Sequence, residues 1–134
     1  MQLVLGAFTA GLDAGYAFAT WPLMGDSLFP TGGWNAAWGV VRNAIDNPVV
    51  VQFIHRWVAF AAAAALVWLA LRVRTAAPVA AVFVIVLLVT QIALGIATLL
   101  TGVEIHVAVL HQANAALLVI ATVACGHALG RQRR

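Results

Sequence analysis

The sequence contains few charged residues and no lysine. Only 8% of its 134 residues are charged and 64% are hydrophobic, whereas a soluble domain carries about 25% charged residues. This composition excludes an ordinary soluble domain and indicates an integral membrane protein. The net charge of +3 comes from arginines at the ends of apolar runs, so no nucleic-acid surface is expected. The single cysteine, Cys125, excludes an internal disulfide.

Three long apolar runs cover residues 48–73, 78–100 and 105–129. Each exceeds the ~20 residues that a helix needs to cross the hydrocarbon core of a bilayer. A fourth apolar run, residues 1–11, is only about half a span long. It has no basic segment or cleavage site that would mark a signal peptide. We therefore expect one all-α transmembrane domain over residues 1–134.

Residues 12–47 form the one long connection between apolar runs. Glycines, prolines and three tryptophans punctuate it, a pattern typical of a loop at the membrane interface. Within it, residues 33–45 suit a short amphipathic helix. The apolar face of that helix would carry Trp34, Trp38, Val41 and Ile45.

A weak internal repeat links two of the apolar runs. Residues 2–9 (QLVLGAFT) match residues 91–98 (QIALGIAT) at four of eight positions, and a run with a histidine near its start follows each copy. One explanation is chance similarity between apolar stretches. The other is a true repeat, which predicts a four-helix transmembrane bundle with a pseudo-two-fold internal repeat. Thirteen span residues precede the second copy and only Met1 precedes the first, so the first helix is expected to be truncated.

The arginines also predict orientation. Arg72 and Arg74 join two spans, and residues 131–134 hold three more arginines after the last span. Because basic residues favour the cytoplasmic side, we expect both segments there. The loop at residues 12–47 then lies outside.

Two histidines stand inside predicted spans. His55 and His111 lie at similar depth from the outer side, and ionisable residues at such positions usually mark function. Two imidazoles on neighbouring helices can ligate both faces of one heme iron. The alternatives are interhelical hydrogen bonds in a heme-free bundle, or zinc, which is disfavoured because no cysteine or carboxylate converges with them. Arg56 is expected either to bind a heme propionate or to extend to lipid headgroups. His106 and His127 are expected at the two membrane–water interfaces.

Neighbouring small and polar residues fit a cofactor pocket. Gly6 and Gly95 lie at a comparable depth, and Asn114 follows His111 on the same face, so all three are expected to leave clearance. Small residues also serve ordinary helix packing. Gln2 and Gln91 are expected to be packing polar groups or pocket contacts.

Four segments resemble one family. Residues 10–15 (AGLDAG), 21–25 (WPLMG), 52–56 (QFIHR) and 109–112 (VLHQ) look like the outer loop and histidine helices of the heme A synthases. That resemblance implies an eight-helix oxidoreductase of two similar halves, which oxidises the heme O methyl group to the formyl group of heme A for cytochrome oxidase. In this family the C-terminal half holds a heme b between two histidines.

The resemblance points to the C-terminal half. Gln52 stands where the other half has its reactive glutamate, and the outer-loop cysteine pair of that half is absent. His55 and His111 are then the axial ligands of heme b, with Arg56 as a further cofactor contact and no catalytic residue in this chain. The implied partners are a missing N-terminal half or a second chain, membrane lipid and an unidentified electron donor, in the cytoplasmic membrane of a bacterium. The alternative is a free-standing transmembrane b-type cytochrome that passes electrons to quinone.

Overall fold

The computed structural model describes residues 1–132 of the chain. Arg133 and Arg134, which the sequence assigns to the cytoplasmic side, lie outside the described residues. Within residues 1–132 the secondary structure is helical, apart from an isolated bridge between Met24 and Ser27. The expected all-α fold is confirmed for this part of the chain.

Three helices are long and apolar enough to cross a membrane. They are α3 (Pro48–Val73), α4 (Pro78–Leu100) and α5 (Ile105–Gln132). α3 and α4 have the bounds expected from the sequence, and α5 continues three residues past residue 129. The shorter elements are α1 (Gln2–Gly11), the 3-10 helix η1 (Ala14–Tyr16) and α2 (Val40–Asp46).

Polar side chains cap the starts of two long helices. The Asn47 side-chain oxygen accepts a hydrogen bond of 3.0 Å from the amide of Val49 at the start of α3. The Glu104 carboxylate accepts one of 3.0 Å from the amide of Val107 at the start of α5. Each cap satisfies a backbone donor that has no partner within its helix. Glu104 also lies at the positive end of the α5 dipole.

The helix expected over residues 33–45 is shorter in the structure. α2 begins only at Val40, so Trp34 and Trp38 precede it. The cause is Asn43, whose fully buried side chain donates hydrogen bonds of 2.9–3.3 Å to the carbonyl oxygens of residues 35, 38 and 39. These bonds wrap the preceding segment around the side chain as turns, which is a common use of asparagine outside helices.

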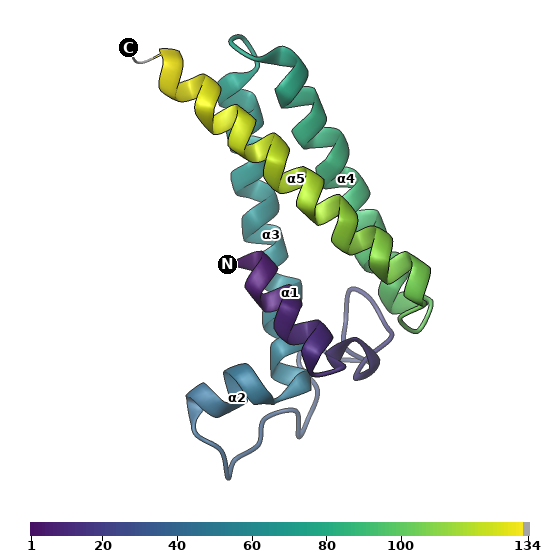
Figure 1. The fold of residues 1–134 in the computed structure, drawn as a ribbon. Coiled ribbons are helices and arrows are strands. Elements are labelled where there is room, and N and C mark those ends of the chain that lie inside the picture. Colours follow the sequence, from purple (N-terminus) through teal and green to yellow (C-terminus); the bar gives the residue numbers. More distant parts are fainter. Residues whose placement is uncertain (133–134) are drawn as a thin grey trace.

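The long helices pack together at one end and separate toward the other. The buried core gathers near the α3–α4 connection, at what we call the core end; its members are Ala70, Val73, Ala81, Val84, Leu88, Leu118 and Cys125. From there α4 and α5 stay paired while α3 diverges from them, and α1 lies against the far half of α3 (Figure 1). The opposite end, which carries the loop of residues 12–47, is the loop end.

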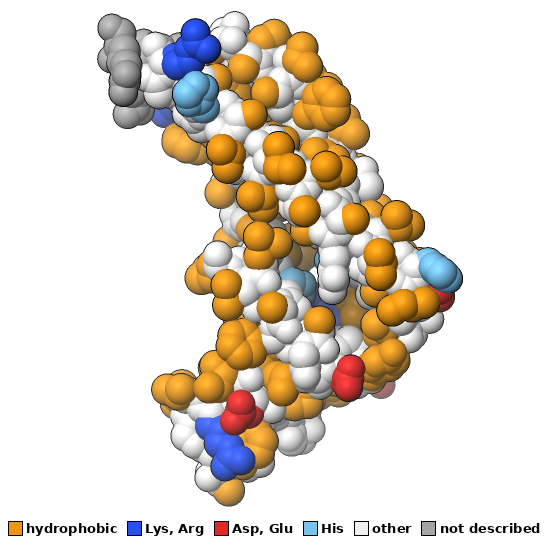
Figure 2. Space-filling model, in the orientation of Figure 1, with side chains coloured by type: hydrophobic (Ala, Val, Ile, Leu, Met, Phe, Trp, Pro, Cys, Tyr) orange, Lys and Arg blue, Asp and Glu red, His pale blue; other side chains and the backbone are white. Residues whose placement is uncertain are grey.

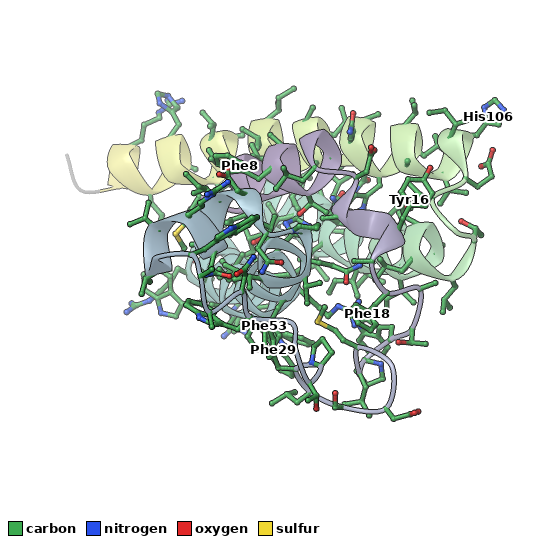
Figure 3. The ribbon with its side chains drawn as sticks, turned by 90° about the horizontal axis from the view of Figure 1, so that it is seen from below. Phe8, Tyr16, Phe18, Phe29, Phe53 and His106 are labelled. Carbon is green, nitrogen blue, oxygen red and sulfur yellow. The ribbon has the colours of Figure 1, made fainter. Side chains whose placement is uncertain are left out.

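Apolar contacts tie the loop to the helices. The Phe29 ring of the loop packs edge-on against Phe53 of α3 with their centroids 5.1 Å apart, and the two lie next to each other in Figure 3. Gly15 of η1 lies against Val103 of the α4–α5 connection, where an added Cβ atom would come within 2.8 Å of the valine Cγ2. The loop therefore spans from α3 to the α4–α5 pair across the loop end.

Candidate functional site

His55 lies on α3 and is contacted by α1. It is the eighth residue of α3, roughly 10 Å from the start of the helix. The Gln2 side-chain nitrogen lies 3.2 Å from the ring Nδ1 and donates a 2.9 Å hydrogen bond to the carbonyl oxygen of His55. A Cβ atom on Gly6 would lie 3.4 Å from the ring Cε1. Gln2 and Gly6 are four residues apart, so both lie on the face of α1 that meets the imidazole.

His111 lies on α5 in a matching environment. It is the seventh residue of its helix, roughly 9 Å from the start. The Gln91 side-chain nitrogen lies 3.2 Å from both Nδ1 and Nε2 of the ring. A Cβ atom on Gly95 would come within 3.0 Å of Cε1. The same contact set, a glutamine and a glycine four residues later on the preceding helix, thus occurs at both histidines.

The two half-buried histidines lie where the helices diverge. Both α3 and α5 begin at the loop end, so the similar depths of His55 and His111 are measured from the same end. The buried core lies at the other end, and Figure 2 shows a hollow between the α1–α3 arm and the α4–α5 pair. Histidine and basic side chains are visible on the floor of this hollow. This arrangement leaves room between two imidazole-bearing helices.

Arg56 is folded under the loop. It is only 7% exposed, and its Nη1 donates hydrogen bonds to the carbonyl oxygens of Thr20, Pro22 and Leu23 at 2.9, 3.1 and 2.9 Å. The interpretation of Arg56 as a side chain extended to lipid headgroups is therefore wrong. Its Nε and Nη2 atoms are buried without a partner among the described residues. Two free donors on a buried cation suit an anionic acceptor such as a carboxylate.

Gln52, one turn before Arg56, also binds the loop. Its side-chain nitrogen donates to the carbonyl oxygens of Phe18 at 3.0 Å and Gly15 at 3.5 Å. Gln52 thus anchors the loop to α3 in this chain.

Asn114 was missed as a polar contact of the site. Expected to leave space below His111, it is instead buried, and its side-chain nitrogen donates to the Leu87 carbonyl at 2.9 Å and to Gln91 Oε1 at 2.7 Å. That expectation is wrong because the amide fills the gap between α4 and α5. The sequence feature that points to this hydrogen-bonding role is an asparagine one turn after a histidine in an otherwise apolar helix.

The other two histidines do not join the site. The His106 side chain is 88% exposed, lies 3.9 Å from the Glu104 carboxylate and points away from the helices at the edge of Figure 3. His127 is exposed near the core end of α5. Over the described range, residues 1–132, no three side chains of His, Cys, Asp or Glu gather into a cluster.

Comparisons with known proteins cover nearly the whole chain. The family model described as cytochrome oxidase assembly protein (COX15-CtaA) matches residues 1–123. Heme A synthases of Rhizorhabdus wittichii, Sphingopyxis alaskensis and Erythrobacter litoralis are 57%, 43% and 41% identical over 99%, 98% and 100% of this chain. The chain spans 38%, 37% and 39% of the lengths of these three relatives. No solved structure matches it. The resemblance drawn from the sequence is thereby confirmed, and the chain belongs to the family of cytochrome oxidase assembly proteins that includes the heme A synthases.

Proposed function

We propose that this chain is the heme b-binding half of a heme A synthase, with His55 and His111 as the axial iron ligands. The complete enzyme would oxidise the methyl group of heme O to the formyl group of heme A, as an oxidoreductase of cytochrome oxidase assembly. The observation that carries the proposal is the repeated contact set, in which two imidazoles at matched depth each lie against a glutamine and a glycine. We further propose that the two sets are related by a pseudo-two-fold axis in a four-helix bundle.

The residues present fit a heme. The divergence of α3 from α4 and α5 gives space between the histidines, and Gly6 and Gly95 put no side chain beside either ring. The two unpartnered donors of the buried Arg56 suit a propionate. A heme bound by two histidines would carry single electrons and would have no open coordination position for oxygen.

The remainder of the reaction is assigned to a partner. Gln52 is a neutral amide that donates to the loop, and an amide cannot exchange a proton as a carboxylate does. We propose that the heme O site and its reactive glutamate are supplied by another half or a second chain. The lengths of the relatives support this division, because this chain spans only 38% of the Rhizorhabdus protein.

The first test is a dithionite-reduced minus oxidised spectrum of the detergent-purified chain, with pyridine hemochrome analysis. We expect one low-spin b-type heme per chain, and we expect His55→Ala or His111→Ala to abolish its low-spin bands. The matched controls are His106→Ala and His127→Ala, which remove exposed histidines of α5 and should leave the spectrum unchanged. An unaltered low-spin spectrum in either His55→Ala or His111→Ala would refute the ligand assignment.

A second measurement separates the synthase from a free-standing cytochrome. Co-expression with the N-terminal half of a related heme A synthase, in cells that make heme O, should yield heme A. A chain that binds heme but never supports heme A formation would instead be an electron carrier.

A further inference from the structure

A short chain of hydrogen bonds connects α4 and α5 beside His111. The Asn114 side-chain nitrogen donates to Leu87 O and to Gln91 Oε1, and the Gln91 nitrogen faces both ring nitrogens of His111. Asn114 is only 8% exposed, so water does not compete freely for these groups. Each end of the Gln91 amide therefore has a defined neighbour.

The direction of this relay is fixed by a backbone carbonyl. Leu87 O can only accept, so the Asn114 atom at 2.9 Å must be the nitrogen. Its second hydrogen is directed at Gln91, so the Gln91 atom at 2.7 Å must be the oxygen. The opposite end of the Gln91 amide, the NH₂ group, is then directed at His111.

The His55 side has no such relay. The Gln2 nitrogen is held by a single backbone acceptor, His55 O, and the Gln2 oxygen is buried without a partner. The residue three positions after His55 is Val58, which has no polar group to orient the glutamine. The repeated contact sets therefore differ in what fixes the glutamine.

We propose that Asn114 is a positioning residue that fixes Gln91 with its N–H groups toward His111, and so withholds a hydrogen-bond acceptor from that imidazole. A neutral imidazole that ligates iron has an N–H on its other nitrogen, and an acceptor facing that N–H makes the ligand more basic. With Asn114 in place, Gln91 offers no such acceptor. Without Asn114, the Gln91 amide is free to turn its oxygen to the ring. The consequence for the iron rests on the proposed function, whereas the direction of the amide does not.

The direct test is nitrogen NMR of the detergent-solubilised chain labelled with ¹⁵N in the histidine rings, before heme is added. The His111 resonances are identified by their loss in His111→Ala. In the wild type, the His111 ring nitrogen that accepts from Gln91 should be unprotonated. Asn114→Leu should exchange the tautomer, so that the proton moves from the other ring nitrogen to the one that faces Gln91. Thr122→Val removes a polar group elsewhere on α5, one bonded to Leu118 O, and should leave these resonances unchanged. Resonances unaffected by Asn114→Leu would overturn the proposal.

The consequence is tested by redox titration of the heme-loaded chain. Asn114→Leu should shift the heme midpoint potential to more negative values, because a more basic ligand favours the ferric iron. In a Gln91→Leu background the same substitution should cause no further shift, whereas a purely structural role of Asn114 would act equally in both backgrounds. Equal shifts would therefore overturn the proposal. Asn114→Ala serves as a second variant if Asn114→Leu does not fold.

The two hypotheses fail in different ways. A wild-type chain that binds no heme would defeat the proposed function, while the ring-nitrogen resonances would still decide the role of Asn114. A chain with a normal bis-histidine spectrum, but with a potential and resonances unaffected by Asn114→Leu, would retain the function and lose the positioning role.

Discussion

At Gly95 the backbone of α4 approaches the His111 ring so closely that one methyl group would disturb it. A Cβ atom there would lie 3.0 Å from Cε1 and 3.5 Å from Nδ1, while the equivalent atom on Gly6 would lie 3.4 Å from Cε1 of His55. His111 is also held by Gln91, so its ring cannot move without loss of a hydrogen-bond contact. An added side chain is therefore tolerated less well at position 95 than at position 6.

We predict that Gly95→Ala destabilises the protein by about 1–3 kcal/mol, the usual range for overpacking a filled site. It should also lower the heme content per chain, because the ring that would ligate iron is displaced. Thermal unfolding followed by circular dichroism and pyridine hemochrome assays measure the two effects. Gly6→Ala should be milder, and Gly126→Ala, which meets nothing within 4 Å on α5, is the control without a contact. Alanine favours a helix more than glycine does, so helix propensity alone would not destabilise either variant. A Gly95→Ala variant as stable as Gly126→Ala would show that the contact with the ring has no effect.

The candidate site is only partly readable from single residues. His55 and His111 stand out because an ionisable side chain within an apolar run is costly and needs a reason. The contacts of Gln2 and Gln91 with them require the helices to be placed side by side, which no local pattern specifies. The size of Asn114 predicts open space, whereas its role depends on the hydrogen bonds that its amide makes with Leu87 and Gln91.

Among the elements, α3 depends most clearly on one residue at its start. The Asn47 oxygen accepts from the amides of Val49 and Val50, and the Asn47 nitrogen donates at 2.9 Å to both Gly33 O and Asn43 Oδ1. One side chain therefore caps the helix and also fastens the loop. Since α3 carries His55, this cap sets the position of the site.

We predict that Asn47→Ala lowers the free energy of unfolding by about 1–2 kcal/mol through loss of the cap, and releases the loop as well. Asn47→Asp separates the two roles, because a carboxylate keeps the cap but cannot donate to Gly33 or Asn43. Unfolding in detergent reports the first role, and hydrogen exchange of the amides of residues 33–39 reports the second. Slow exchange retained in Asn47→Asp would show that the donated bonds do not hold the loop.

The long elements were more predictable than the loop. Uninterrupted apolar runs and prolines at positions 48 and 78 predict where α3 and α4 begin, because these signals are local. The helix expected over residues 33–45 begins earlier than α2 does, because Asn43 bonds to backbone groups up to eight residues away in the chain. Such bonds compete with helix formation but leave no periodic signature in the sequence.

At the scale of the whole molecule, the buried cluster between the long helices and the candidate site lie in different parts of the bundle. The buried core lies at the core end, and the histidines lie toward the loop end, where the helices separate. Packing at one end can hold the helices together while the other keeps space between them. The sidedness of this arrangement in the membrane is a prediction from Arg72 and Arg74, which lie at the core end.

Paired cysteine substitutions test that sidedness. Thr31→Cys places a thiol in the loop of residues 12–47 and Thr75→Cys places one between α3 and α4; both positions are exposed. The native Cys125 is fully buried and is replaced by alanine in both variants. We expect a membrane-impermeant maleimide to label Thr31→Cys on intact cells, and to label Thr75→Cys only after permeabilisation.

The result also fixes the depth of the site. Because His55 and His111 lie roughly 10 and 9 Å from the loop ends of their helices, labelling of Thr31→Cys from outside would place both imidazoles in the outer leaflet. Labelling of Thr75→Cys alone would invert the topology and move both imidazoles to the cytoplasmic leaflet. Either orientation keeps the two histidines together, since α3 and α5 both begin at the loop end. The pairing of the histidines therefore depends on the fold alone, whereas the side of the membrane on which they lie depends on this measurement.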